Sequence, residues 1–122
     1  MIKDVYKFNK EIIGITQPNT PTVLNKERLL FGLTAMYEEL HELTLANNSN
    51  NVGEVLDAII DLIYFAIGRA YEIGITEDQF KKCWNIVQQK NMLKKKGKKN
   101  RGTDIDACKP EGWEAADLNK IL

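Results

Sequence analysis

The chain of 122 residues carries 17 basic and 17 acidic side chains, so its formal net charge at pH 7 is zero. A molecule without a net field is not drawn by charge to nucleic acid or to a membrane surface, and we expect neither partner. The length suits a single domain, 1–122, with a helical core that oligomerisation completes.

No feature of the sequence indicates export. The first residues, MIKDVYKFNKEIIG, lack a long apolar core and a small-residue cleavage site, and no segment reaches the roughly 18 apolar residues of a membrane span. Cys83 and Cys108 match no metal-ligand spacing. The sequence therefore predicts a cytoplasmic protein with reduced thiols.

The spacing of apolar residues predicts an all-α bundle of four to five helices. The first helix is expected over 2–13, and Gly14 ends it. Prolines then mark a loop. Asn25 is expected to cap a second helix that runs to about residue 46. Its apolar stripe consists of Leu29, Leu33, Met36, Leu40 and Leu43.

The second half of the chain begins with the most apolar helix. This third helix is expected from about residue 52 to 73, apolar on nearly every side, and a fourth over 76–93. In the fourth, Phe80, Trp84 and Val87 are expected to face inward. No strand is predicted. The basic segment 93–108 has too little apolar surface to pack and is expected to be mobile, whereas 109–122 docks on the body.

Two groups of acidic residues are spaced to share a helix face. At 100° per residue, the third member of the first group lies about 40° and 60° from the other two, and the members of the second group fall within about 60° of arc. The second helix carries Glu38, Glu39 and Glu42, and the third carries Glu54, Asp57 and Asp61. Two antiparallel helices would bring up to six carboxylates together.

Asp61 is the one charged residue in the apolar stretch AIIDLIYFAI. A buried carboxylate without a partner costs several kcal/mol, and no Lys or Arg on either helix is expected to neutralise the acidic groups. Ordinary solvated helix faces are the alternative, but the acidic sides also carry Phe31, Phe65 and Gly68. Clustered carboxylates favour a hard cation, so we expect Mg²⁺ first and Mn²⁺ second, with Asp61 as a ligand.

His41 is the only histidine, and with Glu38 it forms a Glu-x-x-His motif. This motif occurs in di-iron bundles, which use two copies of it. One histidine supplies only one copy per chain, so His41 is interpreted as a partly exposed polar residue.

Four segments, EELHE, EVLDAIIDLIYFAIG, KNMLKK and KPEGW, together resemble the all-α nucleoside triphosphate pyrophosphohydrolases. This MazG-like group includes phosphoribosyl-ATP pyrophosphohydrolase and dimeric dUTPases, and the likeness to small bacterial and phage forms covers nearly the whole chain. It implies Mg²⁺-dependent hydrolysis of a nucleoside triphosphate to monophosphate and pyrophosphate, in a homodimer or homotetramer. Phosphoribosyl-ATP is the competing substrate. A non-catalytic helical module that binds nucleic acid or protein is the rival of another class.

The resemblance assigns the acidic residues. The E-E-x-x-E ligands of the family fall on Glu38, Glu39 and Glu42, and the closing Asp of its E-x-x-D falls on Asp61. The Glu of that second motif falls on Ala58. Its register therefore stays open between Asp57 with Asp61, which we favour, and Glu54 with Asp57. Glu39 or Glu42 would orient the attacking water.

The resemblance also assigns residues for the substrate. Asn91 and Lys94 match the N-x-x-K of the family, and Lys109 to Trp113 match its KPEGW. Lys94 and Lys95 would hold the outer phosphates. Trp113 would stack on the base or, as we favour, anchor the tail.

Overall fold

The computed structural model describes all 122 residues and divides them into two compact units, 1–76 and 77–122. Helices dominate, so the all-α fold class is confirmed. The assignment of both units to one domain stays a prediction. No helix combines the length and the apolar character that crossing a bilayer requires.

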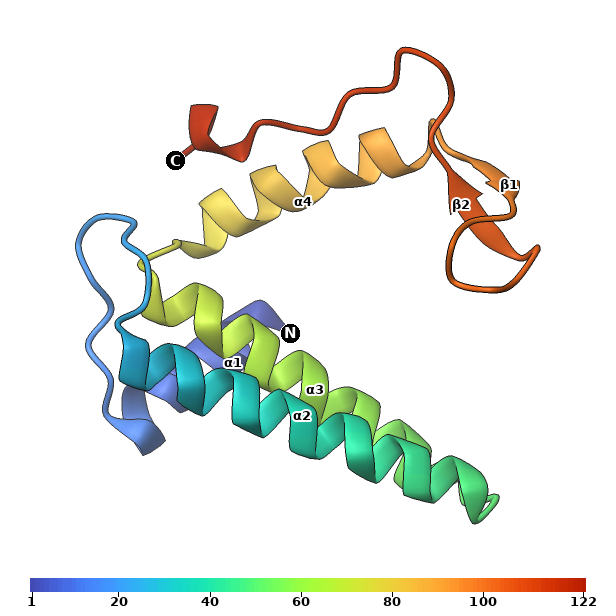
Figure 1. The fold of residues 1–122 in the computed structure, drawn as a ribbon. Coiled ribbons are helices and arrows are strands. Elements are labelled where there is room, and N and C mark those ends of the chain that lie inside the picture. Colours follow the sequence, from blue (N-terminus) through green and yellow to red (C-terminus); the bar gives the residue numbers. More distant parts are fainter. The chain divides into compact units, whose positions relative to one another are not determined.

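The first unit is built on two long helices. The short helix α1 (Ile2–Phe8) continues into a π-helical turn, η1 (Asn9–Ile13), before α2 (Lys26–Asn48) and α3 (Val52–Glu72). Figure 1 shows α2 and α3 side by side and antiparallel, with α1 against α3. The expected ranges of the second and third helices are confirmed to within about two residues.

Side-chain caps explain where the long helices begin. The Asn25 side-chain oxygen accepts a hydrogen bond from the Arg28 amide at 2.9 Å, as predicted, and Asn51 accepts one from the Glu54 amide at 3.2 Å. The first helical segment ends at Gly14, whose φ of 76° is left-handed.

The loop between η1 and α2 is held against the C-terminal end of α3. The Gln17 side-chain amide donates to the carbonyl oxygens of Tyr71 and Ile75, and the Tyr71 hydroxyl donates to the Ile15 carbonyl. Gly74 has a φ of 83°, and a Cβ there would lie 2.8 Å from the Thr20 carbonyl oxygen. Glycine is therefore required where the loop crosses this end of α3.

Small residues form the contact between the two long helices. The buried positions of α2 are Gly32, Ala35, Glu39 and Ala46. The expected leucine stripe does not pack in the unit, because Leu29, Leu33 and Leu40 are between 41% and 47% exposed. The acidic side of α2 thus faces α3, and the leucine side is left on the surface.

The second unit holds α4 (Glu77–Asn91), two short strands and a 3₁₀ turn, η2 (Leu118–Lys120). Strands β1 (Lys95–Gly97) and β2 (Asp106–Cys108) pair antiparallel, so the expectation of no strand is wrong. Backbone pairing and the Arg101–Asp106 ion pair hold this polar hairpin with little apolar surface. The expectation that Trp84 faces inward is also wrong, because its side chain is 61% exposed.

Candidate active site

A cavity of about 460 Å³ lies within the first unit. This volume is typical of small-molecule pockets in proteins. Two candidate metal ligands line it, Glu39 from α2 and Asp61 from α3. Two arginines that the sequence analysis did not select, Arg28 and Arg69, line it as well. The cavity therefore contains charged groups of both signs.

Four carboxylates form the acidic cluster of the structure: Glu39, Glu42, Asp57 and Asp61. Burial, a side-chain hydrogen bond with Glu42 and the charges of Glu42, Asp61 and Asp57 raise the pKa of Glu39 from 4.5 to about 7. Burial, followed by the charges of Asp57 and Glu42, also raises the pKa of Asp61. These carboxyl groups repel one another, and no cation compensates them.

Glu39 is the most enclosed member of the acidic cluster. It is only 9% exposed, and its Oε2 atom is buried without a hydrogen-bond partner. A buried acceptor without a donor is costly, so this atom is suited to a ligand that enters the cavity.

The remaining acidic candidates, Glu38 and Glu54, contribute to neither raised pKa. Glu38 is exposed and lines a separate surface hollow with His41 and Glu42. Glu54 is exposed in the first turn of α3, and it contributes to neither raised pKa, whereas Asp57 contributes to both. This arrangement favours the register of Asp57 with Asp61.

The acidic cluster offers oxygen donors only, which is the donor chemistry of Mg²⁺ and Mn²⁺ sites. The unpartnered Oε2 of Glu39 fits the same role. The structure does not gather three or more Asp, Glu, His or Cys side chains in the arrangement of a metal centre. The donor set fits a hard cation, and the assignment of individual ligands stays a prediction.

Aromatic rings line the cavity between the carboxylates and the arginines. Phe31 of α2 and Phe65 of α3 meet edge to face with ring centres 6.4 Å apart. Phe8 and Tyr64 form a second such pair at 5.3 Å. Planar ligand groups pack well against such walls.

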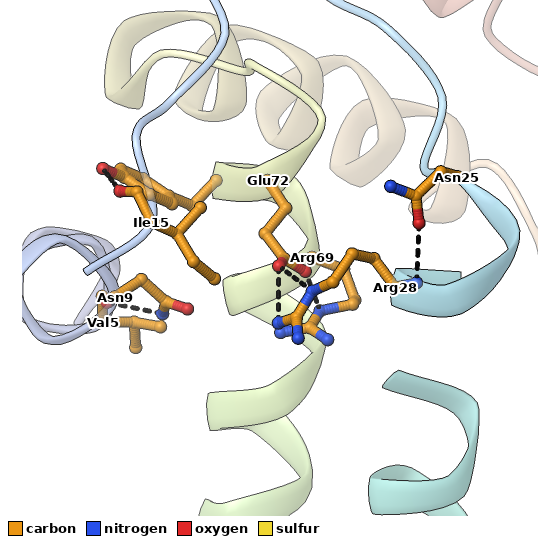
Figure 2. Close-up of polar contacts among 8 residues, drawn as sticks. Val5, Asn9, Ile15, Asn25, Arg28, Arg69 and Glu72 are labelled. Carbon is orange, nitrogen blue, oxygen red and sulfur yellow. Dashed lines mark hydrogen bonds and ion pairs between the residues drawn. The ribbon is translucent and has the colours of Figure 1, made fainter. Parts of the chain in front are cut away.

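The arginine end of the cavity is organised by one carboxylate. Arg28 Nε donates to Glu72 Oε1 at 2.7 Å, and Arg69 Nε lies 3.0 Å from Glu72 Oε2. Figure 2 shows Arg28 reaching from α2 to meet Arg69 and Glu72 of α3. Both guanidinium groups also lie over the Phe31 ring, 4.3 and 5.1 Å from its centre.

Helical spacing could have revealed this end of the cavity. Arg28 precedes Glu39 by eleven residues, about three helical turns, and therefore lies on the same face of α2. Arg69 follows Asp61 by eight residues on α3. The sequence predicts that no Lys or Arg on either helix neutralises the acidic groups, and that prediction left the two arginines of the cavity unnoticed. The arginines line the same cavity, but they are compensated by Glu72 rather than by the acidic cluster.

The predicted substrate-binding residues lie together in the second unit. The Trp113 indole N–H donates to the Lys90 carbonyl oxygen at 2.8 Å, and the Lys94 and Lys109 amines each lie 5.0 Å from its ring centre. The Lys94 amide donates to the Asn91 carbonyl oxygen at 3.0 Å.

Lys95 belongs to β1, where it pairs with Cys108. Trp113 attaches the C-terminal segment to the end of α4 through its hydrogen bond to Lys90. Two of the five predicted residues, Lys94 and Lys109, thus lie near the ring of a third, Trp113, and the role of all five toward a substrate stays a prediction.

Comparison with known proteins identifies the family. Residues 5–91 match the family described as phosphoribosyl-ATP pyrophosphohydrolase, a match that covers most of the chain, including part of α1 and all of α2, α3 and α4. No curated protein matches significantly. This family is part of the MazG-like all-α nucleoside triphosphate pyrophosphohydrolases, so the predicted resemblance is confirmed. The chain belongs to the phosphoribosyl-ATP pyrophosphohydrolase family, whose members hydrolyse an acid anhydride.

Proposed function

We propose that the protein hydrolyses a nucleoside triphosphate to the monophosphate and pyrophosphate, with Mg²⁺ or Mn²⁺ held by the acidic cluster. One observation carries the proposal: the buried, unpartnered Oε2 of Glu39 lies beside Asp61 on a cavity large enough for a nucleotide. Membership of a pyrophosphohydrolase family supports the reaction type.

The acidic cluster needs a cation to accept this substrate, because a polyphosphate is repelled by carboxylates. A bound divalent ion supplies that neutralisation and acidifies a water molecule. Glu39 and Asp61 are the first candidates to hold it, since both line the cavity. Asp57 and Glu42 lie near enough to affect their charges and complete the proposed set.

A general base is available in the same cluster. Glu39 lines the cavity beside Asp61 and is the first candidate for orienting the attacking water. Glu42, its hydrogen-bond partner, is the second candidate for orienting the water. Glu38 and Glu54, which lie outside the cluster, are the least supported of the predicted ligands.

Phosphoribosyl-ATP is the second candidate substrate, and the description of the matching family favours it. The same anhydride bond is broken in both cases, so the acidic cluster serves either substrate. The lysines near Trp113 belong to the second unit, and their predicted role toward phosphate groups rests on the sequence resemblance.

We also propose that the protein is a homodimer or a homotetramer. The leucine side of α2 and the residues Leu56, Ile59 and Ile60 of α3 are exposed over long helices. A surface this apolar is typical of an interface, and a second copy of the chain fits the prediction from sequence.

The function is tested by incubating the protein with Mg²⁺ and a panel of triphosphates that includes phosphoribosyl-ATP, and measuring pyrophosphate. The proposal predicts metal-dependent release from at least one of them. Asp61→Asn should abolish the release while the protein stays folded. Release that is equal with and without metal, or equal in Asp61→Asn, would contradict the role of the acidic cluster.

A further inference from the structure

The arginine end of the cavity contains donor groups that its own carboxylate does not satisfy. Arg28 and Arg69 carry two positive charges, and Glu72 supplies one negative charge between them. The Nη1 atom of Arg69 is buried and has no hydrogen-bond partner. An arginine has only donors, so the group that completes it must be an acceptor.

Arg69 is fixed in place rather than free to reach solvent. Its side chain is 13% exposed, and Glu72, which it contacts, is 5% exposed. Gly32 provides the room, because a Cβ at this position would lie 2.5 Å from Arg69 Cδ and 2.9 Å from Nη1. Gly32 of α2 thus leaves space for the side chain of Arg69, which lines the cavity.

The two long helices place the acidic cluster and the arginines at opposite ends of the cavity. Glu39 to Arg28 on α2 spans about 16 Å, and Asp61 to Arg69 on the antiparallel α3 spans about 12 Å in the same direction, at 1.5 Å per residue. The aromatic walls lie between these ends. A nucleotide with its phosphates at the acidic cluster therefore has its base against the rings and its far edge toward the arginines.

We propose that Arg69, supported by Arg28, is a specificity-determining residue that binds an acceptor oxygen on the part of the nucleotide farthest from the triphosphate. This inference rests on the proposed function of the acidic cluster. The oxygen belongs either to an oxo group of the base, such as the 6-oxo group of hypoxanthine or guanine, or to the phosphate of a phosphoribosyl group attached to the base, as in phosphoribosyl-ATP. An amino group at the same place offers a donor to a donor and is rejected.

The base arm of the test compares ITP with ATP, which differ at position 6 in an oxo or an amino group. The wild type should turn over ITP at least about tenfold better than ATP in kcat/KM, as expected for a hydrogen bond to a charged donor. The phosphate arm compares phosphoribosyl-ATP with ATP. A preference in the first arm identifies a base oxygen, and a preference in the second identifies a phosphate.

In whichever arm the wild type shows a preference, Arg69→Met should bring the ratio of the two kcat/KM values close to one. Glu72 keeps its contact with Arg28 in this variant, so no carboxylate is left unpaired. Gly32→Ala, which displaces Arg69 without removing it, should lower the same ratio. Arg69→Lys, which keeps the charge but loses the planar fork, is measured if Arg69→Met folds poorly, and it too should lower the ratio.

Tyr71→Phe is the matched structural control. Tyr71 is buried on α3 two residues from Arg69, and its hydroxyl bonds the Ile15 carbonyl outside the cavity lining. This change should lower stability and leave both ratios unaltered. The proposal is overturned if neither ratio differs from one in the wild type, or if the folded Arg69 variants retain the wild-type ratios.

Binding separates failure of this inference from failure of the proposed function. Calorimetry with IMP and AMP, or with phosphoribosyl-AMP, needs no turnover. If the wild type releases no pyrophosphate yet binds IMP or phosphoribosyl-AMP more tightly than AMP, and Arg69→Met loses that difference, the arginine end is supported and the reaction is not. Equal binding of all three ligands contradicts the arginine end.

Discussion

Both ends of the cavity bring like charges together, but only the arginine end receives an opposite charge from the chain itself, and that charge compensates it in part. At the arginine end, Arg28 and Arg69 share the carboxylate of Glu72. At the acidic end, Glu39 and Asp61 have further carboxylates as neighbours, and both have raised pKa values. Glu72 fixes the orientation of both guanidinium groups and leaves a donor of Arg69 free for an acceptor, whereas carboxylates with no opposite charge nearby indicate that a cation comes from outside the chain.

The largest effect is expected from removing a charge at the acidic end. Asp61→Asn should reduce turnover by orders of magnitude, because a ligand that touches the metal or the phosphate is lost. Without metal, the same change should leave stability unaltered or raise it, since it relieves repulsion from Asp57 and Glu42. Steady-state kinetics and thermal unfolding in a chelator measure the two effects. Full activity with unaltered Mg²⁺ dependence would remove Asp61 from the site.

A paired control determines the register on α3. Asp57→Asn should be damaging and Glu54→Gln mild, because Asp57 contributes to both raised pKa values and Glu54 to neither. Kinetics of both variants at saturating Mg²⁺ make the comparison. The reverse order of damage would show that Glu54, not Asp57, belongs to the site.

Removing a carboxylate charge at the arginine end should lower the free energy of unfolding, whereas at the metal-free acidic end it should leave it unaltered or raise it. Glu72→Gln leaves two guanidinium groups without their shared carboxylate, which should cost roughly 3 kcal/mol of unfolding free energy. Urea denaturation of Glu72→Gln and of metal-free Asp61→Asn in one buffer measures the contrast. If both variants lose stability equally, the distinction between the two ends is not real.

The pH dependence of stability follows from the raised pKa of Glu39. Its pKa is about 7 in the folded state against 4.5 as the ordinary value, so its contribution to stability is full below pH 4.5 and is lost as pH rises through 7. The melting temperature of the metal-free protein should therefore fall between pH 5 and 8 by the equivalent of a few kcal/mol at most. Glu39→Gln should flatten the curve in this window. A wild-type curve that rises would contradict the raised pKa.

Substituting an exposed leucine of α2 should change the oligomeric state of the protein and not the chemistry of the acidic cluster. Leu33→Glu places a charge on the exposed side of α2 and should shift the oligomer toward the monomer in light scattering. Ile105→Glu, at a residue of the second unit that is 77% exposed, is the matched control. A wild type that is monomeric at micromolar concentration would contradict the proposed assembly.

The sequence predicted the long helices well because their caps and periodicity are local signals. Asn25 and the apolar spacing placed α2 and α3 to within about two residues. The hairpin β1–β2 was missed because its residues are polar and its stability comes from backbone pairing. The inward face of α2 was misjudged because glycine and alanine, not leucine, allow close approach of α3.

The candidate site was predicted in part. The acidic residues stand out by charge, and four of the six lie in one cluster. The arginine end was not found, although helical spacing places Arg28 on the same face of α2 as Glu39; its pairing with Glu72 joins residues 44 positions apart and has no local signature. Gly32 gave no signal either, since its role is the space that it leaves for Arg69.

The central claim, that the acidic cluster binds a divalent cation, is tested most directly by the melting temperature of the protein with and without Mg²⁺ at pH 8. Binding to the folded state should raise unfolding free energy by about 2.7 kcal/mol at a hundredfold excess over the dissociation constant. The account predicts a clear rise for the wild type and a much smaller one for Asp61→Asn. No rise at millimolar Mg²⁺ or Mn²⁺, or an equal rise in both proteins, would contradict it.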